Sequence, residues 1–283
     1  HREYFANPAK HGIHIDRLTC LEDKAPCLII TPDASAGLGR RGKLIRLQIQ
    51  SSPVAHGHVV GTVVLLHGRN GRKEDLLPVA ERFCAIGLRC LIPDLPAHGE
   101  SPVHATRFGL DEWEKNLSAD VLNECAKHFE FDPRPAALWG ISMGGSFATS
   151  AASAIRSHWS SLTIVSSFDR LDHVIEGQCR SAILAGFISD ISQRNGGPKL
   201  SAVQPQRWAT KAKLPVLVAH GTDDALIDEE LGHRLYSSFP SEEKRWVEVE
   251  GGTHSNVLTT PKPLYSIMAD WILVHLGGDR TTE

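Results

Sequence analysis

The stretch AALWGISMGG, residues 136–145, decides the expected architecture. Its first four residues are apolar and predict a buried strand, while the Ala- and Ser-rich residues 143–158 predict a helix packed closely against it. Between them, G-x-S-x-G at 140–144 predicts a tight turn that glycine permits on both sides of Ser142. A serine at such a strand–turn–helix corner projects from the sheet end, beside free helix N–H groups that can hold negative charge. Ser142 is therefore the candidate nucleophile.

Around this corner, apolar strand segments alternate with helix-period segments from residue 58 onward. This alternation predicts an α/β fold with a mostly parallel central sheet and helices on both faces. The expected strands are 58–66, 88–92, 136–139, 161–166, 214–219 and 245–249, and the expected helices are 74–86, 111–131, 143–158 and 262–276. In the first 57 residues, IHIDRL, CLIITP and KLIRLQIQ are expected to form short antiparallel strands that extend one sheet edge.

Residues 169–213 interrupt this rhythm between two expected strands. An insertion of that length inside a compact domain is usually functional, so we expect a cap within a single domain spanning 1–283. A purely structural insertion is the alternative. The apolar residues of this segment suffice to roof a pocket, and its charges predict that the outer face stays wet. The apolar set is Ile175, Ile183, Leu184, Phe187 and Ile188, and the charged set is Arg170, Asp172, Glu176, Arg180, Asp190 and Arg194.

A serine hydroxyl needs a base to take its proton. Among fifteen histidines, His254 in GGTHSN is the best candidate, because it follows an expected strand in a Gly-rich loop and precedes the last helix. The alternative is an ordinary surface-loop histidine. The acid that orients the base should follow a strand end, and Asp223 and Asp224 compete there, after LPVLVAHG. Asp224 is preferred and Asp223 is interpreted as a turn former, with Asp169 as a more distant rival.

The tetrahedral intermediate of such a reaction needs backbone donors aimed at its oxyanion. The N–H of Met143, directly after the nucleophile, is one candidate. The N–H of Arg69, in the loop after VVLLHG, is the other, with His67 and Gly68 as scaffold. The Arg69 side chain is either a binder of an anionic substrate group or a solvated surface residue.

Five motifs in order resemble the landmarks of α/β-hydrolase esterases and of their monoglyceride-lipase-like members. They are HGRNG at 67–71, DLPAHGES at 94–101, GISMGG at 140–145, HGTDDALI at 220–227 and GGTHSN at 251–256. The resemblance implies the α/β-hydrolase fold and the chain order Ser, acid, His, which favours His254 as base. Pro96-Ala97 departs from the usual family turn, and Asp94, His98 and Ser101 are assigned to loop structure. Serine rather than aspartate at the corner argues against the dehalogenase and epoxide hydrolase branches.

The expected activity is hydrolysis of a carboxylic ester through an acyl-enzyme, with Ser142, Asp224 and His254 as the triad and without a cofactor or metal. Acyl transfer, C–C bond hydrolysis and peptidase action use the same triad and stay open as alternatives. A non-catalytic binding protein on this scaffold is the alternative of a different class. Neither the acyl group, the alcohol nor the oligomeric state follows from the motifs.

The formal net charge of −3 argues against a general nucleic-acid binder, so the expected partner is a small-molecule ester. No run approaches the roughly 18 apolar residues of a spanning helix, and no apolar signal core is present at the N-terminus. We expect a cytoplasmic protein, with an exported mature chain as the alternative because the sequence begins at His1. The six cysteines lack metal-site spacing, and Cys20 with Cys27 could cross-link a hairpin in an oxidising compartment.

Overall fold

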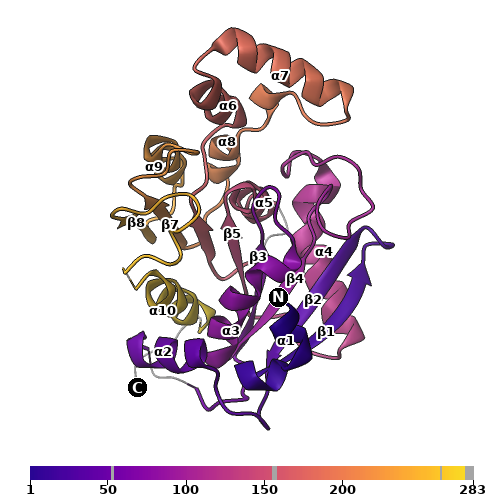
Figure 1. Cartoon of the computed structure of the whole chain (residues 1–283), viewed down its shortest axis with the longest axis vertical. Helices are drawn as coiled ribbons and strands as arrows, with labels where there is room; N and C mark the ends of the chain where they lie inside the picture. Colours follow the sequence, from indigo (N-terminus) through magenta and orange to yellow (C-terminus); the bar gives the residue numbers. More distant parts are fainter. Residues whose placement is uncertain (52–53, 155–157, 262, 278–283) are drawn as a thin grey trace.

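A computed structural model describes residues 1–51, 54–154, 158–261 and 263–277 (Figure 1). Within these residues one sheet of eight strands runs in the order β1-β2-β4-β3-β5-β6-β7-β8. The strands are β1 (Ile13–Cys20), β2 (Ala25–Pro32), β3 (Gly61–Leu66), β4 (Leu88–Pro93), β5 (Ala136–Ile141), β6 (Leu162–Val165), β7 (Val216–Gly221) and β8 (Lys244–Val249). All neighbours from β4 to β8 pair in parallel, whereas β2 is antiparallel to both β1 and β4. The predicted α/β class and mostly parallel sheet are confirmed.

Helices cover both faces of the sheet. They are α1 (Arg2–Ala6), α2 (Arg40–Gln48), α3 (Leu77–Ala85), α4 (Glu112–His128), α5 (Met143–Ala152), α6 (Leu171–Cys179), α7 (Ala182–Arg194), α8 (Pro205–Ala209), α9 (Glu229–Ser237) and α10 (Leu264–Leu276), with short 3₁₀ turns η1 (Pro8–His11), η2 (Lys73–Leu76) and η3 (Leu200–Ala202). The apolar side chains of α4, α5 and α9 pack on one face of the sheet, and those of α2, α3 and α10 pack on the other. Along β3, Val64 and Leu66 join the first cluster while Val63 and Leu65 join the second, as a strand buried on both faces requires.

The expected strands and helices from residue 58 onward occur near their predicted positions, with shifts at their ends. The strand predicted from His58 begins at Gly61, and the helix predicted over 143–158 ends at Ala152. Residues 155–157 of that prediction, and residue 262 of the predicted last helix, lie outside the described residues.

The N-terminal prediction is right for IHIDRL and CLIITP, which form the hairpin β1–β2, and wrong for KLIRLQIQ. Most of that third stretch is helix α2, so residues 40–48 pack as a helix on α3 instead of extending the sheet. Gly42 and Ile45 are buried three residues apart, and a Cβ at Gly42 would lie 2.9 Å from that of Ala85 on α3. Leu44 and Leu47 face solvent, so the near-alternating pattern that suggested a strand buries only one helical stripe.

The hairpin cannot hold the cross-link that Cys20 and Cys27 suggested. Residues 21–24 form the turn, so the register places Cys20 opposite Ala25 and Cys27 opposite Leu18. Both thiols are free and buried, and the sulfur of Cys20 lies 3.8 Å from that of Cys125 on α4. The possible cross-link is therefore not formed in this structure, because a four-residue turn sets the two cysteines out of register.

Between β6 and β7 the chain forms α6, α7, η3 and α8, in the segment expected to be a cap. Figure 1 shows α6 and α7 projecting beyond the end of the sheet, with α7 outermost. Leu171 N–H donates to the carbonyl of Val203 (3.1 Å) and Gln206 N–H donates to that of Asp169 (3.0 Å). These two hydrogen bonds join the start of the segment to its end. Of the helices in the described ranges, none combines the length and apolar character that crossing a bilayer requires.

Candidate active site

The corner between β5 and α5 holds Ser142 in a strained backbone conformation. Its φ of 54° and ψ of −121° fall in a region that favours glycine, and the residue is only 8% exposed. The corner is this sharp because the glycines allow close packing: a Cβ at Gly140 would lie 2.3 Å from the carbonyl oxygen of Gly144, and one at Gly144 would lie 2.0 Å from that of Leu66. Ser142 N–H donates to the carbonyl of Val165 on β6 (2.9 Å), and this bond fixes the turn to the sheet.

The structure brings Ser142, His254 and Asp224 together in one chain of hydrogen bonds. Nε2 of His254 lies 3.1 Å from Oγ of Ser142, and Nδ1 of His254 lies 2.8 Å from Oδ2 of Asp224. Because an ionised carboxylate only accepts, Nδ1 carries the ring proton and Nε2 presents a lone pair to the serine hydroxyl. This is the tautomer that a general base for Ser142 requires.

Asp224 is buried at 6% exposure on the turn after β7. Its Oδ1 accepts from the backbone N–H groups of Leu226 (3.0 Å) and Ile227 (2.9 Å), which leaves Oδ2 for His254. Burial acts to raise the pKa of this carboxyl, but hydrogen bonds from His220, His254 and Ile227 outweigh burial and hold the pKa well below its ordinary value. Asp224 is therefore ionised at neutral pH.

The structure separates the two rival acids from His254. Asp223 is exposed, and its carboxylate accepts from the Thr222 hydroxyl at 3.1 Å. Asp169 is buried, but its two oxygens accept from the Arg170 N–H (2.7 Å) and from Nδ1 of His173 on α6 (2.9 Å). Asp169 thus anchors the start of the segment 169–213, and Asp224 is the carboxylate hydrogen-bonded to His254.

The loop after β3 lies directly against the nucleophile. A Cβ at Gly68 would lie 3.4 Å from that of Ser142, so glycine gives the backbone room to approach. In the described residues, the N–H groups of Arg69 and Met143, the two predicted oxyanion donors, make no hydrogen bond, so both are free to donate. One donor lies on the loop after β3 and the other is the first residue of α5, directly after Ser142, which is the arrangement that an oxyanion hole needs.

His67 holds this loop in place. Its Nδ1 donates to the Gly68 carbonyl (2.9 Å), and its Nε2 accepts from the Leu95 N–H (3.0 Å). Burial lowers the pKa of His67 to about 4, so the ring stays neutral and cannot reach the nucleophile's proton while making both bonds. The ring therefore has the scaffold role that the sequence suggested for it.

Asp94 was also assigned to loop structure, and it is the first residue after strand β4. Lys73 is buried beside it: Nζ of Lys73 donates to Asp94 (2.6 Å) and to Glu100 (2.7 Å), and the Lys73 N–H donates to Asp94 (2.8 Å). His98 bonds the carbonyl of Pro96, and Ser101 bonds that of Lys24. These contacts are structural, and they give the loops beside Ser142 a fixed shape.

A cavity of about 300 Å³ lies between the cap and the core, next to the loop that carries Arg69. Its wall is mostly apolar and is drawn from three regions: the segment before α4, the cap helices α6 and α7, and residues 195–200. The lining residues include Phe108, Leu171, Ile175, Ile188, Pro198 and Leu200, with Arg69, His104 and Asn195 as polar members. An apolar cavity with a few polar groups is the usual form of a small-molecule site.

We predicted that the charged residues of segment 169–213 give it a polar, solvated outer face, and this prediction was wrong for α7. Ile183, Leu184 and Phe187 are 77%, 48% and 62% exposed and lie on one side of the helix. Ala185 is the one buried residue of α7, while Ile188 and the 58% exposed Ile191 line the cavity. The charges that suggested a wet face are spread over α6 and the ends of α7, because composition alone does not tell which side of a helix each residue occupies.

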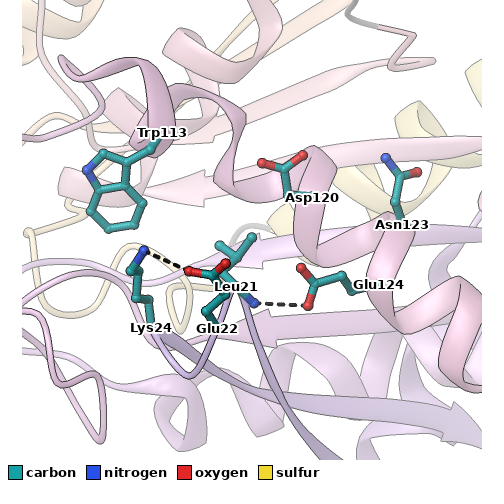
Figure 2. Close-up of a pocket in the computed structure, with 7 residues that line it drawn as sticks. All are labelled: Leu21, Glu22, Lys24, Trp113, Asp120, Asn123 and Glu124. Carbon is teal, nitrogen blue, oxygen red and sulfur yellow. Dashed lines mark hydrogen bonds and ion pairs between the residues drawn. The ribbon is translucent and has the colours of Figure 1, made fainter.

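Another cavity, of about 340 Å³, lies between the β1–β2 turn and α4 (Figure 2). Its lining is largely charged or amide, and Leu21 N–H donates to Glu124 (2.9 Å) across it. Figure 2 shows Trp113 at one end and Glu22 beside Lys24 on the turn. Among the described residues, no serine, cysteine or histidine lines it, so it offers no counterpart of Ser142 or His254.

The sequence did not identify His220, which is fully buried on β7 beside the acid. Its Nε2 lies 2.9 Å from the carbonyl oxygen of Ile227 and 3.5 Å from Oδ2 of Asp224. The signal for it was the first histidine of HGTDDALI, two residues before the turn. Local sequence does not distinguish a histidine that contacts the acid from an ordinary buried strand residue.

The family model described as the alpha/beta hydrolase fold matches residues 61–189. No curated protein sequence matches the chain. An esterase of Pyrococcus furiosus is similar in structure with a TM-score of 0.67 and 15% identity, over 95% of this chain and 96% of the esterase. A monoacylglycerol lipase of Paleococcus ferrophilus has a TM-score of 0.59 and 19% identity, over 77% and 96% of the two chains.

A cold-adapted esterase from an Arctic intertidal metagenomic library is similar with a TM-score of 0.58 and 18% identity, over 93% of this chain and 94% of that one. At these identities the likeness concerns the fold. With the matched family model and the sheet order described above, it confirms the predicted architecture. The chain is an α/β-hydrolase-fold protein that resembles the esterase- and lipase-like members of that fold.

Proposed function

We propose that this protein is a serine hydrolase that cleaves a carboxylic ester through an acyl-enzyme. The observation that carries the proposal is the chain of hydrogen bonds from Ser142 through His254 to Asp224. The similarity to esterases supports ester hydrolysis in general terms.

In the proposed mechanism, Nε2 of His254 takes the proton of Ser142 while Oγ attacks the ester carbonyl. The N–H groups of Met143 and Arg69 then stabilise the tetrahedral oxyanion. His254 gives its proton to the leaving alcohol and an acyl-enzyme forms, and it next activates the water that hydrolyses this intermediate. Asp224 stabilises the imidazolium in both steps.

The cavity beside Arg69 supports an apolar acyl group of short or medium length. Its volume of about 300 Å³ is at the small end of ligand sites. Closure by Ile175 of α6 and Ile188 of α7 would keep bulk water from the acyl-enzyme.

The test is labelling and turnover together. Wild-type protein should bind one fluorophosphonate per chain at Ser142 and hydrolyse p-nitrophenyl butyrate. S142A should lose labelling and at least about three orders of magnitude of turnover, since only binding and oxyanion stabilisation would remain. Near-wild-type hydrolysis by S142A would refute the proposal, and labelling without any turnover on esters would favour acyl transfer or another reaction of the same triad.

The exposed apolar stripe of α7 favours a second candidate, an ester hydrolase that acts at a lipid surface. The double variant I183S/F187S, which removes two members of the stripe, should leave hydrolysis of soluble p-nitrophenyl butyrate unchanged. If the second candidate holds, wild-type rates on monoglyceride or triglyceride should rise sharply above the solubility limit, and the variant should lack this rise.

A further inference from the structure

We infer that His220 is a positioning residue for Asp224, a second imidazole that fixes the acid in the orientation His254 needs. The inference rests on the proposed function and adds a residue to its machinery. His220 is the second-last residue of β7, and Asp224 lies on the turn that follows.

The direction of the hydrogen bond fixes the tautomer of His220. Its Nε2 lies 2.9 Å from the carbonyl oxygen of Ile227, which can only accept, so Nε2 carries a proton. The same N–H lies 3.5 Å from Oδ2 of Asp224. It therefore has a strong bond to Ile227 and a longer, weaker approach to the oxygen that accepts from His254.

These contacts hold the Asp224–Ile227 turn from both ends. Ile227 donates its N–H to Oδ1 of Asp224 (2.9 Å) while its carbonyl accepts from His220. Oδ2 is bounded by the N–H of His254 at 2.8 Å and that of His220 at 3.5 Å. Because both carboxylate oxygens of Asp224 have N–H donors, rotation of the carboxylate about the Cβ–Cγ bond would break several hydrogen bonds at once.

Packing against α9 and β8 confines the imidazole ring of His220 to one position. A Cβ at Gly232 on α9 would lie 2.2 Å from Nδ1, so only glycine at that helix position admits the imidazole. Trp246 on β8 lies nearly parallel to the ring, at 6.3 Å between centroids and 16° between planes. Within the described part of the chain Nδ1 has no hydrogen-bond partner, so a second ring proton would be buried without an acceptor.

The charged and titratable groups facing this site come from three elements. Asp224 lies on the following turn, His233 on α9 packs against Trp246 with 4.9 Å between ring centroids, and Glu248 on β8 is the register partner of His220. Oδ2 of Asp224 lies 3.5 Å from Nε2 of His220. His233 is exposed and makes no contact with Asp224 in the described structure, so it provides a matched control.

The experiment compares H220L, which removes the donor, with H220Q, whose amide N–H can still reach Ile227, and with the control H233L. Each is assayed for p-nitrophenyl butyrate hydrolysis across pH, per mole of serine titrated to completion by fluorophosphonate. We expect H220L to lose about 10- to 100-fold in kcat with KM little changed, because the base is displaced by a fraction of an ångström. H220Q should recover most of this loss, and H233L should match the wild type.

The pH profile separates positioning from packing. Without the His220 N–H near Oδ2, the carboxylate charge is concentrated on the bond to His254 and favours the imidazolium over the neutral ring. Since His254 acts as a base only when neutral, the acid limb of kcat/KM should move upward by roughly half a pH unit in H220L. Proton NMR of the Nδ1–H of His254 gives a second readout, and its downfield resonance should shift in H220L but not in H233L.

An H220L variant with the wild-type kcat, acid limb and resonance would overturn the inference. So would equal losses in H220L and H220Q with an unmoved acid limb, which would assign His220 to packing alone. A wild-type protein whose Ser142 is not labelled and that hydrolyses no ester would instead refute the proposed function, and in that case the NMR comparison still tests whether His220 positions Asp224.

Discussion

Replacing Asp224 by asparagine tests the acid with almost no change in shape. Oδ1 of Asp224 accepts from the N–H groups of Leu226 and Ile227. An asparagine must keep its carbonyl oxygen there, because its amide N–H₂ would meet two further donors. The N–H₂ therefore takes the place of Oδ2, 2.8 Å from Nδ1 of His254.

An N–H₂ group only donates, so it forces His254 into the tautomer with the proton on Nε2. Nε2 then presents N–H to Ser142 at 3.1 Å and cannot take the serine proton. We expect D224N to lose on the order of 10⁴ in kcat, which corresponds to about 5.5 kcal/mol of activation free energy. KM should change little, because the acid does not touch the substrate.

The neighbouring carboxylate gives a matched control. Asp223 is exposed, so D223N makes the same chemical change one residue away and should alter kcat by less than about twofold. Both variants are assayed on p-nitrophenyl butyrate, with urea unfolding to check that the fold is retained. A loss of less than tenfold in folded D224N, or equal losses in the two variants, would refute the reasoning about the tautomer.

Three further predictions concern strain, the cavity and pH. S142G should raise the free energy of unfolding by about 1–2 kcal/mol while abolishing activity, since glycine tolerates φ 54° and ψ −121°; an unchanged or lower urea midpoint would argue against strain. I188W should fill the cavity beside Arg69 and lower octanoate relative to acetate hydrolysis by about tenfold; a uniform loss across p-nitrophenyl esters would contradict this assignment. Burial raises the pKa of Glu114 to about 7, although the N–H groups of Arg107 and Gly109 oppose it, so the folded state retains a proton that the unfolded state releases above about pH 4.5. Wild-type stability should thus fall by roughly 2–3 kcal/mol relative to E114Q as pH rises from 4.5 to 7, and urea curves for the two proteins that stay parallel with pH would exclude it.

The site could be predicted from sequence to the extent that its residues follow strand ends. Ser142, Asp224 and His254 each lie in a short Gly-containing turn after a predicted strand, and such turns are local patterns. Parallel strands then bring their carboxyl ends to one edge of the sheet, so the residues meet without further information. The choice between Asp223 and Asp224 depends on which side chain the turn buries, and the hydrogen bonds of the structure separate them.

The sequence could not predict contacts that depend on distant packing. The role of His220 depends on Gly232 and Trp246, which come from a helix and a strand later in the chain. Helix α2 was missed because the stretch 43–50 fits a strand pattern nearly as well as a helical one, and packing on α3 decides between them. The exposed stripe of α7 was missed because the cap has two apolar sides and the sequence does not show which one is covered.

Because β8 lies at the free edge of the sheet, we expect activity to depend on the local stability of this strand rather than on the stability of the whole fold. β8 pairs only with β7 in the described sheet, and of its six residues only Val247 and Val249 are buried. His254 follows this strand directly, so fraying of the edge would carry the base away from Ser142 while the central strands remain intact. The protein should then pass through a partly opened form that is folded but unreactive. In rising urea, reactivity toward a phosphonate should be lost before the far-ultraviolet signal of the sheet and helices.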